Sequence, residues 1–498
     1  MKKNIFKLIP FFAMMLMMSL LIQTKTASAE EDLFYTYTYD YWGVERESPD
    51  AYAMNSVMLG NQLGIGDFNN PEGMFVKDNQ VYICDTLNNR IVQLSYENDS
   101  FKLVKEVKEV NNNGTMQPLS KPYDVFVTED DVWYIADYGN MRIVYTDSEQ
   151  NVKGEIFKPE DEETLEADYQ FLPQKLVVDA ARRIFVQAQN INKGFMEFES
   201  DGEFVGYIGA AEVQFDFVDY FNKLISTKAQ REQMAAFVPT EYNNISLDSE
   251  GFIYATLGTF DESNYKSAKP IRKLNAKGTD ILIRNGYNDP VGDVQIANGG
   301  GYNGPSKFSD VCVLDNDCYY CLDMTRGRIF GYDFQGNMLY AFGGIGYREG
   351  SFKFPVAIEN LGDSLLVLDK ELGSITQLTL TEYGTLINDA LNTYKIGKYD
   401  ESADYWRNVL KLNGNYDLAY IGIGRSLLRQ DKYTEAMEYF ELKLDFKNYS
   451  KAYKLYRKEW IEDHIVYIFG IIVGLILVFF VKNTIAKIRG EVEKEWKE

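Results

Sequence analysis

The chain has 498 residues, 45% of them hydrophobic and 25% charged, with a formal net charge of −23 at pH 7. This composition is typical of folded proteins, and the length is enough for two or three folded units. The negative charge repels phosphate backbones, so we exclude nucleic acid as a partner. The chain contains one histidine, His464, near its carboxyl end. Catalytic triads and histidine-bound zinc are therefore excluded from the part of the chain that precedes it.

The first 29 residues have the features of a secretory signal. Lysines precede an apolar run that extends to Ile22, and Ala27-Ser28-Ala29 has the small-x-small form of a cleavage site. We predict that residues 1–29 are a signal peptide that is removed on export. An uncleaved anchor is the alternative, but the shortness of the apolar run argues against it.

Between Phe34 and about Thr381 one short theme occurs six times. In its two clearest copies, residues 71–92 and 122–144, a β-run, a polar turn and a second β-run ending in Asp precede a loop and an Arg-Ile pair. The weaker copies begin near Pro173, Ile245, Asp310 and Pro355. Repeats of this length made of short strands predict a propeller or a solenoid, because no single unit can bury its own faces.

These residues resemble the NHL repeat, and six copies imply a mainly β fold, a six-bladed β-propeller over residues 30–382. The segment 34–41 alternates aromatic and polar residues, so we predict a strand there. We expect this strand to pair with the last blade, which would close the ring and remove an exposed edge. Helical spacing of apolar residues predicts an insertion at 211–236, which either packs on a neighbouring blade or acts as a lid or docking element.

Equivalent positions of the repeats carry polar residues that would form a ring. The carboxylates of this ring are Asp85, Asp137, Asp323 and Asp369, and Gln187 and Thr256 interrupt it at the two remaining positions. Such a ring suits calcium, which takes oxygen ligands alone. The resemblance instead implies that this Asp is structural and often lies beside an Arg. We favour the structural role and expect no metal.

Tyrosines predicted in loops are candidate ligand contacts at the propeller mouth, because their rings stack on carbohydrates while their hydroxyl groups form hydrogen bonds. These tyrosines are Tyr138, Tyr302 and Tyr347.

Four cysteines occur in the chain, and three of them lie close together in one predicted hairpin. They are Cys84, Cys312, Cys318 and Cys321. The spacing allows a Cys312–Cys318 disulfide, whose geometry the sequence does not give. The Cys318-x-x-Cys321 pair lacks the second pair of a zinc site and does not begin a helix. We interpret all four as buried apolar residues.

After the propeller the repeat length becomes 34, since residues 397–406 recur as residues 431–440 with their aromatic and small residues in register. This pattern resembles the tetratricopeptide repeat, in which small residues let paired helices approach closely. It implies an all-α domain at 383–463, with helix pairs at about 386–412 and 416–446 and a capping helix after them. Such repeats usually bind proteins; a simple stalk is the alternative.

Residues 465–481 contain no charge and are apolar enough to cross a bilayer. We predict a transmembrane helix at 464–482 and a tail at 483–498. Three basic residues follow the apolar run, and Glu462 and Asp463 precede it, so the positive-inside rule places the tail in the cytoplasm. The prediction is a single-pass cell-membrane protein with its amino-terminal domain outside the cell.

The whole arrangement resembles membrane-anchored NHL/tetratricopeptide proteins of Gram-positive bacteria that accompany carbohydrate import systems. This resemblance implies a non-enzymatic binding or scaffold protein with no cofactor. It would hold a carbohydrate or protein ligand near a membrane partner, such as a subunit of an ABC-type importer. The alternative is a calcium-dependent hydrolase of sugar lactones or related esters, since six-bladed propellers of that type place carboxylates and Asn around a cation in the channel. A purely structural envelope protein is a third hypothesis.

Overall fold

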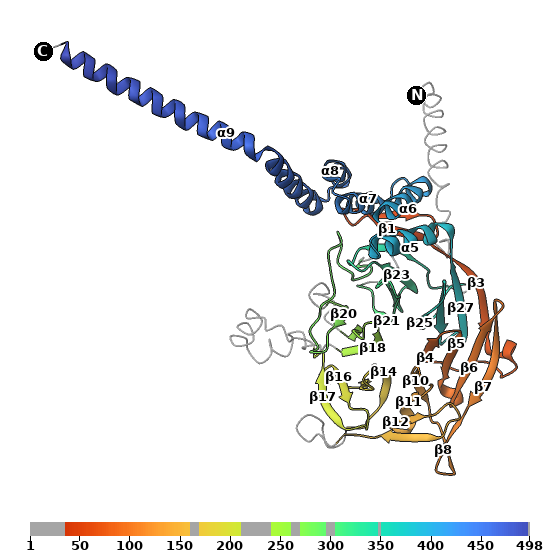
Figure 1. The fold of residues 1–498 in the computed structure, drawn as a ribbon. Coiled ribbons are helices and arrows are strands. Elements are labelled where there is room, and N and C mark those ends of the chain that lie inside the picture. The colour runs from red at the N-terminus through yellow and green to blue at the C-terminus, as the bar shows by residue number, and fades with distance from the viewer. Residues whose placement is uncertain are drawn as a thin grey trace, which may run out of the picture. The chain divides into compact units, whose positions relative to one another are not determined.

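The computed structural model describes residues 35–159, 169–210, 241–259, 269–294, 304–346 and 350–496. Its contacts divide the chain into two compact units, residues 1–385 and 386–498. The first unit is a six-bladed β-propeller and the second is helical (Figure 1). The predicted signal peptide at 1–29 and the predicted insertion at 211–236 lie outside the described residues.

Six antiparallel sheets form the propeller, and each sequence repeat supplies the first two strands of one blade. The first three blades are β4 (Gly73–Lys77), β5 (Gln80–Asp85), β6 (Arg90–Glu97) and β7 (Ser100–Val107); β10 (Pro122–Val127), β11 (Trp133–Asp137), β12 (Arg142–Thr146) and β13 (Val152–Ile156); and β14 (Pro173–Val178), β15 (Ile184–Ala188), β16 (Phe195–Phe198) and β17 (Phe204–Ile208). A hairpin of β8 (Glu109–Asn112) and β9 (Thr115–Pro118) separates the first two.

The remaining blades are β18 (Glu241–Leu247), β19 (Ile253–Thr259) and β20 (Ile271–Leu274); β21 (Phe308–Val313), β22 (Tyr319–Asp323), β23 (Arg328–Tyr332) and β24 (Met338–Phe342); and β25 (Pro355–Leu361), β26 (Ser364–Asp369) and β27 (Ser374–Leu380) with β3 (Tyr52–Leu59). The innermost strands contact one another around a closed ring in the order β4, β10, β14, β18, β21 and β25. Hydrophobic clusters lie between neighbouring blades, so each blade buries its faces only against the next. The predicted fold class is confirmed.

Closure of the ring differs from the prediction. Strand β3 completes the last blade by pairing with β27, from Leu59 opposite Ser374 to Tyr52 opposite Leu380. The tyrosine-rich segment 34–41 supplies β1 (Thr36–Tyr39), which pairs with β2 (Glu45–Ser48) and with β24 of the fifth blade. The prediction that this segment pairs with the last blade is therefore wrong.

Contacts of Tyr37 explain why β1 belongs to the fifth blade. Its side chain is fully buried, and its hydroxyl group donates a 2.8 Å hydrogen bond to Asp293. The guanidinium group of Arg328 lies 4.9 Å from the centre of its ring. Because these partners lie beside the fifth blade, burial and hydrogen bonding select that edge over the last blade.

The helical unit contains two helix pairs and a long final helix. The elements are α5 (Glu382–Lys395), α6 (Tyr399–Leu412), α7 (Asp417–Arg429), α8 (Tyr433–Leu442) and α9 (Phe446–Glu495). Helices α6 and α8 begin 34 residues apart, which is the offset of the sequence repeat. The helix pairs are thus confirmed, while their identity as tetratricopeptide repeats stays a prediction.

Glycines of α7 let its neighbours approach closely. A Cβ atom at Gly422 would lie 2.3 Å from the indole nitrogen of Trp406, and one at Gly424 would lie 2.7 Å from the ring of Phe440. Trp406 and Phe440 occupy the same register of the 34-residue repeat, so each repeat contributes one aromatic side chain that packs against α7.

Helix α9 is continuous through the predicted membrane segment. An 18-residue window within it has a mean hydropathy of 2.8, and none of that window is buried. By length and composition, this helix is apolar enough to cross a membrane.

Candidate binding site at the propeller channel

Two of the predicted ring residues, Asp85 and Asp137, brace their own blades. Asp85 is buried at the end of β5 and accepts hydrogen bonds from Arg90 Nε at 2.6 Å and from the backbone N–H of Asn69 at 2.7 Å. Asp137 repeats this arrangement, with Arg142 Nε at 2.9 Å and the backbone N–H of Ser120 at 2.8 Å. Each carboxylate thus fastens the loop before the blade to the turn that leads into its third strand.

The residues at the other ring positions also form hydrogen bonds within their own blades. Asp323 accepts hydrogen bonds from the backbone N–H of Thr325 at 2.8 Å and from Arg326, and burial raises its pKa. Asp369 accepts four backbone N–H bonds. Gln187 donates to a backbone carbonyl, and its buried Oε1 atom has no hydrogen-bond partner.

In the described part of the chain, no group of three or more His, Cys, Asp or Glu side chains lies close enough to hold a metal ion. The carboxylate groups that the calcium hypothesis requires already accept hydrogen bonds from nearby backbone and side-chain groups.

The structure brings together a different set of residues on the inner strands. In four consecutive blades, the residue just past a register shift is polar, and we call these four the channel cluster: Asp124, Lys175, Asn244 and Asp310. Lys175 Nζ lies 3.6 Å from Asp124 Oδ1. The side-chain amide of Asn244 donates a hydrogen bond to Asp310. These contacts join neighbouring blades, whereas the contacts of Asp85 and Asp137 stay within one blade and the loop before it.

Both carboxylates of the channel cluster also bind the backbone of the next blade. Asp124 accepts a 3.0 Å bond from the N–H of Leu176, and Asp310 accepts a 2.7 Å bond from the N–H of Ile358. Burial raises the pKa of both, to about 7 for Asp310, although Lys175 acts against the shift. For Lys175, burial lowers the pKa, but the carboxylates of Asp124 and Asp310 outweigh it and the pKa is raised.

Two residues beyond the positions of the channel cluster, the inner strands carry apolar side chains in the first two blades and an acidic one in the sixth. The rings of Phe75 and Phe126, on neighbouring inner strands, have their centres 4.8 Å apart. Glu359 lies on β25, and its pKa is raised well above the usual range by burial and then by repulsion from Asp310 and Asp124. In the sixth blade, Ala357 is the residue just past the register shift and so corresponds to the members of the channel cluster. Because side chains alternate along a strand, Glu359 lies on the same face as Ala357.

At one end of the channel, the first residue of an inner strand lies opposite the last residue of the second strand of the same blade. Pro122 lies opposite Asp137, Pro173 opposite Ala188, and Pro355 opposite Asp369. Side chains adjoining these ends make up what we call the mouth cluster: Glu72, Tyr123, Tyr138, Gln189 and Lys370.

Contacts within the mouth cluster join two pairs of neighbouring blades, the second to the third and the sixth to the first. The rings of Tyr123 and Tyr138 stack with centres 4.3 Å apart, and the Tyr138 hydroxyl group donates a 2.6 Å bond to Gln189 Oε1. Lys370 Nζ donates a 3.2 Å bond to Glu72 Oε1. Lys175 Nζ reaches the backbone oxygen of Glu72 at 3.3 Å, which connects the mouth cluster to the channel cluster.

The mouth cluster is only partly buried. The tyrosine pair and Gln189 are half-buried, and the side chain of Lys370 is 24% exposed. Burial raises the pKa of Tyr123 to about 12, with further contributions from Glu72 and Tyr138, so its hydroxyl group stays protonated. An aromatic surface edged by a phenol, an amide and an ion pair suits stacking on a sugar ring and hydrogen bonding to its hydroxyl groups.

Of the predicted mouth tyrosines, the structure places Tyr138 in the mouth cluster, while Tyr302 and Tyr347 lie outside the described residues. The sequence analysis missed Tyr123 and the channel cluster. A signal for the cluster is present in the repeats: the second residue after the opening proline is Asp124 in one copy and Lys175 in the next. A charged residue within an apolar β-run is unusual enough to mark a special position.

The four cysteines are free and buried. Burial raises the pKa of the Cys84, Cys312 and Cys321 thiols well above the usual range, so they stay protonated and unreactive. The interpretation of these residues as buried and apolar is confirmed, and the Cys312–Cys318 disulfide is not formed.

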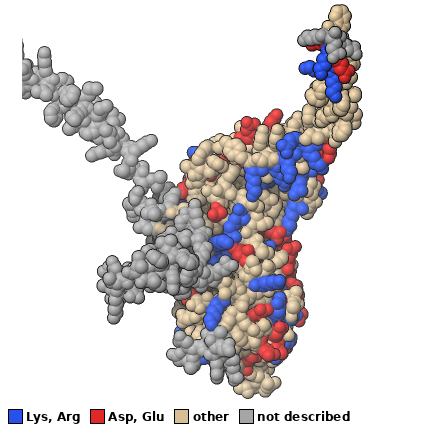
Figure 2. Space-filling model, turned by 90° about the vertical axis from the view of Figure 1, so that its left-hand side faces the viewer, with Lys and Arg blue, Asp and Glu red and all other residues tan. Residues whose placement is uncertain are grey.

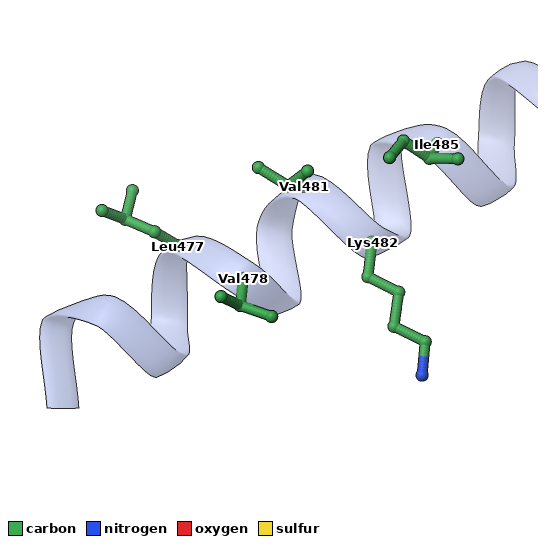
Figure 3. A pocket seen from close by; sticks show the side chains of 5 residues that line it. All are labelled: Leu477, Val478, Val481, Lys482 and Ile485. Atoms are coloured by element: carbon green, nitrogen blue, oxygen red, sulfur yellow. The ribbon is translucent and has the colours of Figure 1, made fainter. Parts of the chain in front are cut away.

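A hollow on the surface of α9 is lined by Leu477, Val478, Val481, Lys482 and Ile485 (Figure 3). All five residues belong to this one helix, and four of them are apolar. Among the residues that the structure describes, no second element lines the hollow, so we assign it to the candidate membrane segment and not to a ligand site.

Comparison with known proteins gives one sequence relative and a set of distant structural likenesses. No protein-family model matches the chain. NHL repeat-containing protein 2 of Gallus gallus is 34% identical over 98 residues, a match that covers 17% of this chain and 14% of that protein. This chain therefore matches about one seventh of the relative's length, which supports the NHL repeat but does not extend to the rest of that protein.

Among solved structures, virginiamycin B lyase from Staphylococcus aureus is 14% identical, with a TM-score of 0.38, and covers 66% of this chain and 100% of its own. A protein of unknown function from Bacteroides thetaiotaomicron is 13% identical, with a TM-score of 0.42, and covers 68% of this chain and 80% of its own. At these scores neither likeness carries an argument. The strand pairing itself establishes the propeller.

Proposed function

We propose that this chain is a membrane-anchored binding protein whose mouth cluster takes a carbohydrate. The helical pairs then contact a membrane partner, for which a subunit of an ABC-type importer fits the predicted arrangement. Residues 30–464 lie outside the cell and residues 483–498 lie in the cytoplasm. The propeller collects the ligand, and α9 keeps it near the partner.

The stacked pair of Tyr123 and Tyr138 is the observation that carries this proposal. The two tyrosines are half-buried. Tyr138 bonds to Gln189, and the Glu72–Lys370 ion pair belongs to the same cluster. Stacking needs an open aromatic face, while the hydroxyl groups of a sugar need donors and acceptors at fixed positions. The mouth cluster offers partly exposed tyrosine side chains beside the polar groups of Gln189, Glu72 and Lys370.

Anchoring is supported by the exposed apolar part of α9. Basic residues flank this part on both sides, with five Lys or Arg in residues 446–464 and five in residues 482–498. Because the two counts are equal, the proposed orientation rests on the signal segment expected at 1–29 and not on the charge difference.

Calorimetric titration of the full-length protein in nanodiscs with a panel of oligosaccharides tests the ligand. We expect one sugar class to bind and Tyr138→Ala to weaken that binding by about fivefold, since stacking on one ring contributes about 1 kcal/mol. Trp42→Ala is the matched control, because Trp42 is an exposed aromatic residue of the same unit, 71% accessible and outside the mouth cluster. Absence of binding throughout the panel would contradict the carbohydrate proposal.

Crosslinking in native membranes, followed by mass spectrometry of crosslinked peptides, tests the partner. We expect a transporter subunit joined to residues 386–464. Crosslinks that join this region only to soluble proteins or to other copies of the chain would contradict the accessory role.

A further inference from the structure

The first part of α9 has an unusual charge for this chain. Residues 446–458 contain five cationic side chains and no acidic one, whereas the whole chain carries a formal net charge of −23. The five residues are Lys447, Lys451, Lys454, Arg457 and Lys458. A dense basic stretch on an acidic protein needs its own explanation, since solubility is already provided by the acidic surface.

Helical spacing places four of these five cations on one exposed face. The four lysines recur at positions i, i+4, i+7 and i+11, which align along a helix. All five side chains are exposed, while Ala452, on another face of α9, is fully buried. Figure 2 shows blue side chains gathered below the projecting helix. We call the five exposed cations, Lys447, Lys451, Lys454, Arg457 and Lys458, the basic stripe.

Six residues, among them Glu459, Glu462 and Asp463, separate the basic stripe from the apolar part of the same helix. At 1.5 Å per residue, Lys458 precedes Ile465 by about 10 Å and Lys454 by about 16 Å along the axis. A bilayer's headgroup layer is roughly 5–8 Å thick on each side. The Debye length is about 8 Å at physiological ionic strength. Lysine and arginine side chains extend several ångströms from the helix. The end of the basic stripe nearest the membrane, from Lys454 to Lys458, therefore reaches the headgroups when the apolar part spans the bilayer.

Aromatic side chains mark the level of the interface between the two parts. Trp460 is 46% exposed, and its ring stacks on His464 with the ring centres 4.5 Å apart. His464 Nδ1 lies 2.8 Å from the backbone oxygen of Trp460. Aromatic side chains with polar edges gather at headgroup level in membrane proteins, so this pair fits the boundary between the basic stripe and the apolar part.

We propose that the basic stripe binds anionic phospholipid headgroups on the side of the membrane that carries the propeller. Lys454, Arg457 and Lys458 contact the phosphate groups, Lys458 by exchanging its 3.6 Å ion pair with Glu462 for a lipid phosphate. Lys451 adds a weaker, screened attraction from farther along the helix. The anionic lipids hold the lower end of the helical unit to the bilayer surface. This proposal rests on the membrane anchoring by α9 that belongs to the proposed function.

The test measures which lipids surround the basic stripe in the full-length protein. Ile461→Cys introduces an exposed thiol for a fluorescent donor, while the four native cysteines are buried and remain unlabelled. The protein is placed in nanodiscs of phosphatidylcholine with 30% phosphatidylglycerol, with an acceptor on the headgroup of one lipid or the other. We expect the phosphatidylglycerol acceptor to be enriched near the donor by about threefold or more, since each basic residue near a membrane adds about 1 kcal/mol of attraction.

Two triple variants separate the basic stripe from general charge. Lys454→Gln, Arg457→Gln and Lys458→Gln together should remove the enrichment. The matched control is Lys482→Gln, Lys487→Gln and Arg489→Gln, which removes the same charge beyond the apolar part and should leave the enrichment at residue 461 unchanged. The labelled Ile461→Cys protein in 1 M chloride, where screening shortens to about 3 Å, gives a second reading that needs no change to the basic stripe, and the enrichment should disappear there.

The outcomes separate this proposal from the proposed function. If the protein co-elutes with lipid but energy transfer to the two labelled lipids is equal, the binding of anionic lipid by the basic stripe is overturned while membrane anchoring stands. Failure to co-elute with lipid would contradict anchoring and this proposal together. Loss of enrichment in inorganic phosphate, but not in chloride of equal ionic strength, would show a site for free phosphate and would overturn the lipid assignment.

Discussion

Asp310 is a buried carboxyl group whose protonation is linked to the stability of the propeller. Burial raises its pKa to about 7 in the folded state, whereas an unfolded chain has an Asp pKa of about 3.9. Between these two values the folded protein binds more protons than the unfolded chain. Its stability therefore falls as the pH rises through this window and is greatest towards the acidic side. Burial raises the pKa of Asp124 and Glu359 in the same direction.

We expect the melting temperature of the propeller to fall between pH 5 and pH 8 and Asp310→Asn to make this fall smaller. Differential scanning fluorimetry across the pH range measures both. Asp130→Asn is the control, because hydrogen bonds from Arg182 and Thr128 lower the pKa of this exposed carboxyl group to about 2. Its effect is thus confined to pH values below about 4. A flat pH profile in the wild type would contradict the linkage.

Asp137 allows the bracing and metal hypotheses to be separated. Removing one partner of a buried ion pair typically costs 3–5 kcal/mol, because the other charge stays buried. We expect Asp137→Ala to lower the free energy of unfolding by about that amount, and a chelator to leave the melting temperature of the wild type unchanged. Asp404→Ala, at an ion pair whose aspartate is 72% exposed, is the control and should have little effect. A drop in melting temperature with chelator that calcium reverses would instead support the hydrolase hypothesis.

At the scale of elements, the repeats predicted the blades because each repeat encodes a complete inner hairpin. Turn residues and alternating apolar residues lie within about fifteen positions of one another, so local pattern suffices for β4–β5 or β10–β11. Ring closure failed because it depends on which of two segments pairs with β27, a contact spanning more than three hundred residues. Local alternation in residues 34–41 identified a strand but not its partner, which Tyr37 selects through Asp293 and Arg328.

The candidate site was less predictable than the fold. The sequence marked Tyr138, a loop residue after a repeated Asp, but not Tyr123, which lies within an inner strand and resembles any other strand tyrosine. Lys175 and Asp310 occupy equivalent steps of different blades, yet their interaction depends on the curvature of the closed ring. Such contacts follow from tertiary geometry and not from spacing along the chain.

Helix α7 offers a test of close packing in the helical unit. A side chain at Gly422 would collide with the indole ring of Trp406, since the Cβ atom alone would lie 2.3 Å from Nε1. Overpacking costs about 1–3 kcal/mol, more than the gain of at most about 1 kcal/mol from replacing glycine in a helix. We expect Gly422→Val to lower the urea midpoint of the helical circular dichroism signal.

Gly414→Ala is the control for that variant. Only the backbone oxygen of Leu410, at 3.8 Å, lies near a Cβ atom at this position. Equal urea midpoints for Gly422→Val and Gly414→Ala would show that Trp406 does not pack as described.

For the whole molecule, the order of the domains along the chain decides which of them share a side of the membrane. The propeller and the helix pairs precede the apolar part of α9, and a short charged segment follows it. If α9 crosses the membrane once, everything before residue 464 lies on one side, including the mouth cluster and the basic stripe. Ligand capture outside the cell requires that side to be the outer one, so the proposed function depends on orientation more than on any single residue.

Single introduced thiols read this orientation directly. Ser450→Cys places an exposed thiol before the apolar part, and Thr484→Cys places one after it, while the native cysteines are buried. With a membrane-impermeant maleimide, we expect Ser450→Cys to be labelled in intact cells and Thr484→Cys only after permeabilisation. The reverse pattern would place the propeller in the cytoplasm and contradict ligand capture outside the cell. Labelling of both in intact cells would mean that α9 does not cross the membrane, since a spanning helix keeps residues 450 and 484 on opposite sides of a hydrocarbon layer about 30 Å thick.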